Sequence, residues 1–163
     1  MNETQNYLQM MIESLRKKDG VLSKIIEKNE AQADCILDKD YGTVDWERFN
    51  VLVAEKDILI NRINEMDQGF SSLYERVRDE VTNNRELYKE DISLMQELIT
   101  SLTDKATRIM TQEERNRVKI EKVLLDAKKE IKHSRKSMKA VSNYYKSMSN
   151  PSGEINGIMD QKK

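Results

Sequence analysis

Apolar residues recur at alternating three- and four-residue steps through a long stretch, Phe70 to Met148, that contains neither Pro nor Gly. This spacing places apolar side chains along one side of a helix, and it is typical of the seam of a coiled coil or a helical bundle. A single helix of this length would span about 120 Å. We therefore expect the helix either to protrude from the domain or to fold back on it.

The residues before this stretch predict two shorter helices, over residues 4–37 and 44–67. The second begins after Thr43 or Asp45, because either side chain can accept a hydrogen bond from a backbone N–H of the first helical turn. Together with the long stretch, these helices predict an all-α fold: an elongated antiparallel helical bundle or coiled coil of three to four long helices.

Gly69 divides the second helix from the third in this interpretation, because glycine readily adopts the left-handed conformation that ends helices. The third helix is then predicted over residues 70–110. The alternative is one continuous helix, because the three- and four-residue steps through Ile63, Met66 and Phe70 stay in phase across Gly69.

The apolar stripe lapses after residue 110, and Thr111 followed by Glu114 forms a capping-box pattern that can begin a helix. The sequence therefore predicts an N-terminal helical bundle over residues 1–110 and a basic amphipathic helix over residues 111–148. Residues 149–163 are predicted to form a flexible tail.

Composition agrees with long helices and excludes several chemistries. The 163 residues are 35% charged and include five Gly and one Pro, which suits thin helices better than sheets and hairpins. The single cysteine, Cys35, rules out an intramolecular disulfide and a cysteine-rich zinc site, and it indicates a reducing compartment. With no signal-peptide pattern and no membrane span, we expect a cytoplasmic protein.

The sequence offers no candidate for catalysis. His133 is the only histidine, it has no metal-ligand partner nearby, and we assign it to a solvated face. The chain also lacks a Gly-rich phosphate loop, a nucleophile elbow and a Cys-x-x-Cys motif. We therefore expect no enzyme activity, no cofactor and no bound metal.

The informative element is the basic helix that follows residue 111. Residues 1–110 hold 15 Lys/Arg and 22 Asp/Glu, whereas residues 111–163 hold 13 and 7. The apolar side of the basic helix is the predicted partner-binding surface: Ile120, Val123, Leu124, Ala127, Ile131, Met138, Val141, Tyr144, Tyr145 and Met148.

Four interpretations of this helix compete. Nucleic acid would use the Lys/Arg face but be repelled by the acidic remainder of the chain. Membrane binding suits a basic amphipathic helix, yet Trp and Phe are absent from its apolar side and stable insertion is not expected. In the third interpretation, the helix has no external partner and simply packs on the chain's own first helices. Docking of another protein's helix agrees with the Met and Tyr content, and we favour it because the first two helices are too short to cover the whole seam.

Five segments, in order, resemble the flagellar export chaperones of the FlgN/FliT type found in clostridia-like bacteria. They are Tyr7, Leu8, Met11, Ile12, Leu15, Lys17 and Lys18; Ile63, Asn64, Asp67, Gly69 and Phe70; Gln112, Glu113, Arg115 and Asn116; Asn143, Tyr144, Tyr145, Lys146 and Met148; and Met159, Asp160, Lys162 and Lys163. Near the end of the chain, Gly157 and Ile158 stand where these relatives usually carry an aromatic residue.

The resemblance implies a small, cytosolic, all-helical secretion chaperone. Its partners would be a late flagellar export substrate, either a hook-associated or a filament-cap protein bound through a C-terminal helical segment, and then the flagellar type III export apparatus. The family's client-binding region would correspond to residues 120–148 here. The alternative function is a self-associating structural coiled-coil adaptor, in which a homodimer covers this helix in the absence of client.

Overall fold

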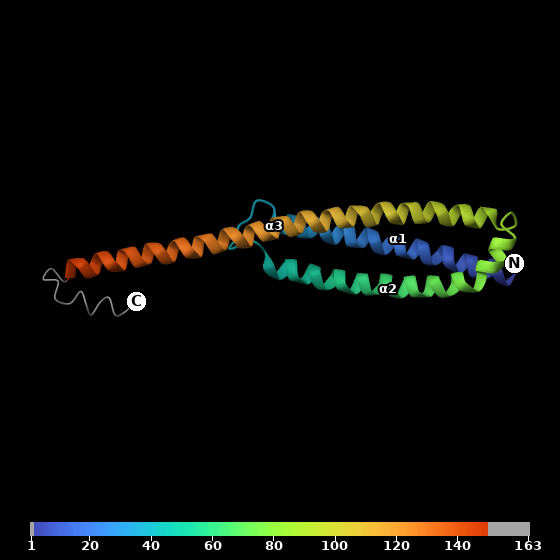
Figure 1. Ribbon diagram of the computed structural model, residues 1–163, viewed down its shortest axis with the longest axis horizontal. Helices are drawn as coiled ribbons and strands as arrows, with labels where there is room; N and C mark the ends of the chain where they lie inside the picture. The colour runs from blue at the N-terminus through green and yellow to red at the C-terminus, as the bar shows by residue number, and fades with distance from the viewer. Residues whose placement is uncertain (1, 150–163) are drawn as a thin grey trace. The chain divides into compact units, whose positions relative to one another are not determined.

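The computed structural model describes residues 2–149 and contains three long helices. They are α1 (Glu3–Ile36), α2 (Trp46–Asn83) and α3 (Lys89–Ser149) (Figure 1). No strand occurs between residues 2 and 149. The all-α prediction is therefore confirmed. Of the predicted tail (residues 149–163), residue 149 belongs to α3 and residues 150–163 lie outside the described residues.

The first two helices begin where side chains satisfy free backbone N–H groups. At the start of α1, the Asn2 side chain accepts a hydrogen bond from the Gln5 N–H at 2.7 Å, and the Gln5 side chain accepts one from the Asn2 N–H at 2.9 Å. At the start of α2, the Asp45 carboxylate accepts a hydrogen bond from the Arg48 N–H at 3.0 Å. Such caps stabilise first turns whose N–H groups have no partner within the helix. Asp45 is one of the two predicted starting residues.

α2 continues through Gly69 to Asn83, so the predicted break was wrong, as were the helices over residues 44–67 and 70–110. The continuous alternative holds as far as Asn83. A helical glycine costs about 1 kcal/mol relative to alanine. Phe70, the next residue, is half-buried and packs against both core clusters of the bundle, and this burial of apolar surface offsets the cost.

The chain reverses at residues 84–88 instead, where Tyr88 fastens the turn to the bundle. Tyr88 is fully buried, its hydroxyl accepts a hydrogen bond from the Asn2 side chain at 3.2 Å, and it donates one to the Glu80 carboxylate at 3.2 Å. The turn is therefore held to the beginning of α1 and to the last turns of α2.

α3 shows no break at Thr111, so the separate helix predicted over residues 111–148 was also wrong. The Thr111 hydroxyl donates a hydrogen bond to the carbonyl of Thr107 at 3.1 Å, one turn earlier in the same helix. Three of the polar residues after Thr111 have partners on α1 or α2, and these partners allow the helix to continue: Gln112, Glu113 and Asn116.

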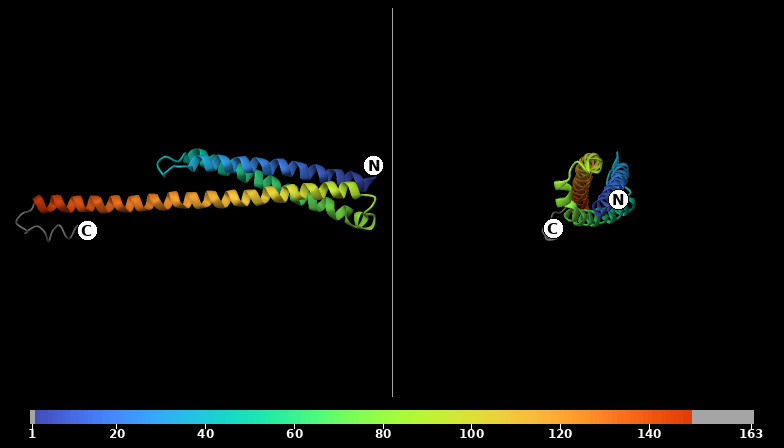
Figure 2. Two further views of the ribbon diagram at one scale, coloured as in Figure 1. Left: turned by 90° about the horizontal axis from the view of Figure 1, so that it is seen from above. Right: turned by 90° about the vertical axis from the view of Figure 1, so that its right-hand side faces the viewer.

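The chain divides into two units, which we call the bundle unit (Met1–Ile120) and the C-terminal unit (Glu121–Lys163). The bundle unit extends beyond the predicted boundary at residue 110. Within it, α2 runs antiparallel to α1, and the first part of α3 runs in the direction of α1 (Figure 1). Viewed from above, α2 lies obliquely to the other two helices (Figure 2).

Two apolar clusters form the core of the bundle unit. Near the α2–α3 turn, the buried members are Leu8, Met11, Val77 and Tyr88. In the middle of the bundle they are Leu15, Val21, Leu22, Ile25, Leu59 and Leu102. Most buried side chains belong to α1, which therefore forms the floor on which α2 and α3 pack.

Replacement of either helical glycine by alanine should stabilise the protein. A Cβ built on Gly20 or on Gly69 meets nothing within 4 Å, so the added methyl group is tolerated while the unfolded chain loses conformational freedom. We expect Gly20→Ala and Gly69→Ala each to raise the free energy of unfolding by about 0.5–1 kcal/mol in urea titrations. Gly42→Ala, in the α1–α2 loop, is the control and should have a smaller effect. A loss of stability at Gly69 would contradict the continuous α2.

Candidate functional site

All ten residues of the predicted partner-binding surface lie on α3. Ile120 ends the bundle unit and is half-buried, and Val123 and Ala127 of the C-terminal unit are half-buried as well. The other seven are exposed, from 46% for Leu124 to 73% for Met138. We call the nine of these residues that belong to the C-terminal unit the C-terminal apolar face.

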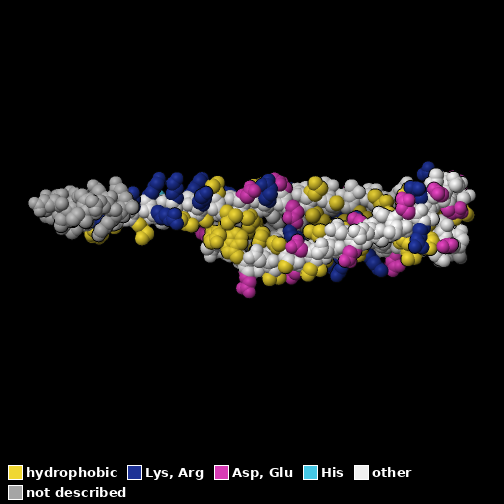
Figure 3. Space-filling model, turned by 60° about the horizontal axis from the view of Figure 1, so that its bottom comes forward, with side chains coloured by type: hydrophobic (Ala, Val, Ile, Leu, Met, Phe, Trp, Pro, Cys, Tyr) yellow, Lys and Arg dark blue, Asp and Glu magenta, His cyan; other side chains and the backbone are white. Residues whose placement is uncertain are grey.

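The C-terminal apolar face follows the heptad repeat and has a basic flank. Leu124, Ile131, Met138 and Tyr145 are seven residues apart and therefore share one side of the helix. Residues 121–149 hold eight Lys/Arg and three Asp/Glu. Figure 3 shows Lys and Arg side chains in a row along this part of α3. The C-terminal unit therefore presents a convex apolar ridge beside positive charge.

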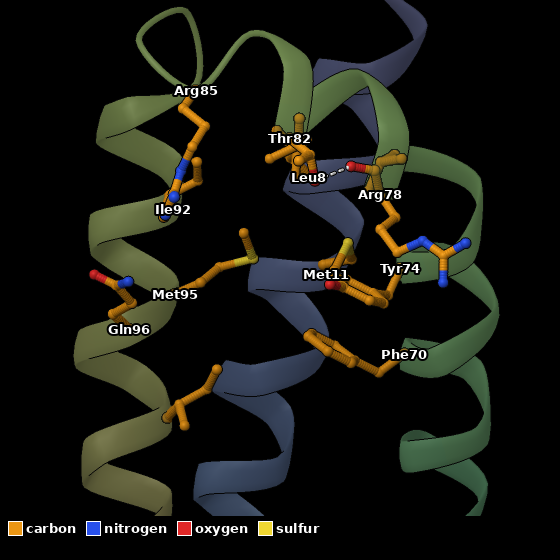
Figure 4. Close-up of a pocket in the computed structure, with 13 residues that line it drawn as sticks. Leu8, Met11, Phe70, Tyr74, Arg78, Thr82, Arg85, Ile92, Met95 and Gln96 are labelled. Atoms are coloured by element: carbon orange, nitrogen blue, oxygen red, sulfur yellow. Dashed lines mark hydrogen bonds between the residues drawn. The ribbon is translucent and has the colours of Figure 1, made fainter.

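The bundle unit contains an apolar hollow between α2 and α3 that sequence reasoning missed (Figure 4). Its volume is about 380 Å³. Phe70 and Tyr74 reach into it from α2 and Met95 from α3, while Leu8 and Met11 of α1 form its floor.

A second hollow of about 400 Å³ continues the first toward the beginning of α2. The two share Phe70 and Ile99, and the second adds apolar residues from all three helices: Leu15, Leu22, Ile63, Met66, Leu102 and Ala106. We call the combined depression the α2–α3 groove. Tyr74 and Ile99, on its two walls, are each 46% exposed, so the groove is open to solvent.

The interfaces of α1 with α2 and of α1 with α3 are closed by ion pairs, unlike the α2–α3 groove. Ion pairs bridge α1 to α2, as between Lys28 and Glu55 at 2.5 Å, and α1 to α3, as between Asp19 and Lys105 at 2.7 Å. The Lys28 ammonium also holds the pKa of the Glu55 carboxyl below its usual value. Ion pairs thus bridge the closed interfaces, whereas the lining of the open groove is largely apolar and includes a few charged residues.

A buried polar layer joins all three helices beyond the groove. The Lys56 ammonium on α2 donates hydrogen bonds to the side-chain oxygen of Asn29 at 2.8 Å and to the Glu113 carboxylate on α3 at 2.6 Å. Asn116 donates to the Asn29 carbonyl at 3.1 Å, and Gln112 accepts from the Asn29 amide at 3.2 Å. These contacts explain why the apolar stripe of α3 lapses here without ending the helix.

The remaining candidates for catalysis or metal binding are His133 and Cys35. His133 is exposed, as predicted. Cys35 is half-buried, and desolvation, followed by the nearby Asp45 carboxylate, raises the pKa of its thiol. Between residues 2 and 149, no group of three or more His, Cys, Asp or Glu side chains is placed to hold a metal ion. Among the described residues, none of the three helices contains an apolar run of the length that a membrane span requires.

Removal of the Glu113 carboxylate should destabilise the bundle unit. The Lys56 side chain is only 9% exposed, so Glu113→Ala leaves its ammonium with a single neutral acceptor. We expect a loss of about 1–3 kcal/mol in the free energy of unfolding, less than for a fully buried pair because Glu113 is half-exposed. Glu114→Ala is the matched control. It breaks only a surface pair with Arg117 within α3 and should leave stability nearly unchanged. Equal effects of the two substitutions would refute the role of the polar layer.

The raised pKa of the Cys35 thiol should be visible in its reactivity. The thiolate is the reactive form, so a raised pKa lowers its population and slows alkylation near pH 8. We expect the rate–pH profile with iodoacetamide to lie at higher pH in the folded protein than in urea. Asp45→Asn, which keeps a capping side chain but removes the charge, should move the profile of the folded protein down, and Arg48→Gln should move it up. A folded profile at or below the unfolded one would contradict the shift.

Comparison with protein-family models, with curated proteins and with solved structures finds no match to this chain.

Proposed function

We propose that this protein binds an amphipathic helix of another protein and shields that helix's apolar side from water. The α2–α3 groove is the observation that carries the proposal. A helix seated in it would complete a four-helix arrangement, contact Phe70, Tyr74 and Ile99, and bury its own apolar stripe in return. Large aromatic side chains in a pre-formed depression are also the usual centres of binding energy in interfaces.

The C-terminal apolar face is the second surface in this proposal. It is convex where the groove is concave, and it retains the role predicted from the sequence. Its exposed members include Met138, Tyr144 and Tyr145, residue types that are frequent in protein interfaces. Because Lys and Arg flank it, the segment that covers it should carry acidic residues beside its apolar stripe.

The resemblance of the sequence to flagellar export chaperones supports a class of partner. We propose a late export substrate, a hook-associated or filament-cap protein, as the source of the bound helix, with delivery to the type III export apparatus after binding. Covering the apolar side of a helix before secretion keeps that helix from aggregating. This role needs binding surfaces and no catalytic group.

The self-associating adaptor is the weaker alternative. In a symmetric dimer through the C-terminal apolar face, two helices that each carry an excess of five positive charges would lie side by side. Like charges at such a distance repel, although salt screens the repulsion. A light-scattering mass that stays monomeric at all concentrations would dispose of the adaptor.

Charged substitutions in the groove should abolish binding without unfolding the protein. We expect Tyr74→Asp combined with Ile99→Asp to weaken binding of the C-terminal helical segments of hook-associated and cap proteins by more than about tenfold, because each buries a carboxylate against apolar surface. Affinity is measured by isothermal titration calorimetry, and retained helicity by circular dichroism. The control is Val51→Asp combined with Ile58→Asp. Those residues are comparably exposed at 45% and 62% but do not line the groove, so binding should persist.

The contribution of the C-terminal apolar face is tested separately. Ile131→Asp combined with Val141→Asp should weaken binding while the melting of the bundle unit stays unchanged, because both residues lie outside that unit. Ser134→Asp combined with Ser137→Asp adds the same charge and serves as the control. If none of the segments binds the unmodified protein, or if the groove and control variants bind equally, the proposed function fails.

A further inference from the structure

We infer that the helix bound in the α2–α3 groove lies with its C-terminal end at the α2–α3 turn, and that this end carries carboxylates. The inference rests on the proposed function, because it specifies the partner of that groove. It starts from the distribution of charge along the groove walls.

Two Arg residues line the end of the groove next to the turn. Arg78 of α2 and Arg85 of the turn both line the first hollow, and Figure 4 shows Arg85 extending from the turn toward Ile92. Within residues 2–149, the Arg85 guanidinium makes no ion pair or hydrogen bond. Arg78 has two long contacts within α2, 3.4 Å to Glu75 and 3.7 Å to Asp79. The Arg85 side chain is therefore available to a carboxylate from outside, whereas Arg78 would have to exchange its contacts with Glu75 and Asp79.

The other part of the groove has no net charge. Among the described residues, its only charged lining residues are Lys18 and Asp67, which pair with each other at 2.7 Å. The described lining of the first hollow includes two Arg and no Asp or Glu. The charge of the groove lining thus changes from neutral to positive toward the turn.

This gradient decides the direction of a bound helix. α2 and α3 run in opposite directions, so their macrodipoles favour neither orientation of a helix between them. The bound helix has a partial positive charge at its N-terminus and a partial negative charge at its C-terminus. Its C-terminus therefore belongs beside Arg78 and Arg85, which makes the bound helix parallel to α2. Acidic residues or a chain-terminal carboxylate at that end add charge-assisted hydrogen bonds to the guanidinium groups.

Two synthetic peptides of equal composition test this inference. Each is a helix of about 22 residues, long enough to span about 33 Å, with Leu and Ile at seam positions and a side-chain staple on the outer face. Both ends are blocked. The first peptide carries two Lys in its first turn and two Glu in its last, and the second has these charges exchanged. The staple keeps both peptides equally helical, which circular dichroism verifies.

We expect the first peptide to bind the full-length protein about three- to tenfold more tightly than the second at low salt, with the difference shrinking at high salt. A nitroxide at its C-terminus should broaden the amide signals of residues around Arg78 and Ile92, and not those around Asp57 and Ile63. Arg85→Glu should remove or invert the preference. Arg62→Glu changes the charge equally on α2 outside the groove lining, so it should leave the preference intact.

The outcomes separate the two proposals. Equal affinities, the opposite preference, or broadening around Asp57 would overturn the inferred direction while helix binding in the groove stands. If neither peptide binds, or if Tyr74→Asp combined with Ile99→Asp leaves their binding unchanged, the groove is not a helix-binding site, and both the direction and the proposed function are overturned.

Discussion

The lengthwise alignment of the three helices depends on the ammonium group of Lys56. An ammonium that is almost entirely buried costs several kcal/mol unless charged and polar partners surround it. Asn29 and Glu113 provide those partners from the two other helices. A slip of α3 by one heptad would move the Glu113 carboxylate about 10 Å along the bundle, out of reach of Lys56. Apolar contacts tolerate such slips far better, so the polar layer specifies the alignment that sets Phe70 opposite Ile99 and creates the α2–α3 groove.

The all-α fold could be predicted from the sequence, because the three- and four-residue periodicity extends over nearly the whole chain. The errors came from local signals that tertiary contacts override. Gly69 is a favourable residue for ending a helix, and Thr111 is a favourable residue for beginning one. Neither interrupts its helix here, because the residues before and after it have partners on the neighbouring helices. At Gly69 those partners are apolar, and after Thr111 they are the polar groups around Asn29. The actual turn follows Asn83 and lies inside the helix predicted over residues 70–110, because that stretch contains neither Pro nor Gly to mark a turn.

The candidate site was predictable only in part. The C-terminal apolar face follows from periodicity alone, since Leu124, Ile131, Met138 and Tyr145 recur at seven-residue spacing. The α2–α3 groove depends on the distance between α2 and α3 where they pack on α1. The hydrophobic periodicity of one helix does not predict that distance. A usable signal was present in α2, where Val53, Ile60 and Tyr74 form a second apolar line beside the seam. Such a wide apolar arc exceeds what one neighbouring helix covers.

Shape and charge together make both apolar surfaces poor partners for a second copy of the chain. Two concave grooves cannot fill each other, and two C-terminal apolar faces bring like charges together. A C-terminal face could enter a groove by shape, but its Lys and Arg extend from Lys122 to Lys146, so some of them would meet Arg78 and Arg85. An acidic or charge-graded helix from another protein avoids all three conflicts. Exposed apolar surface that does not associate with a second copy can still bind a partner helix, which is the physical requirement of the role that we propose.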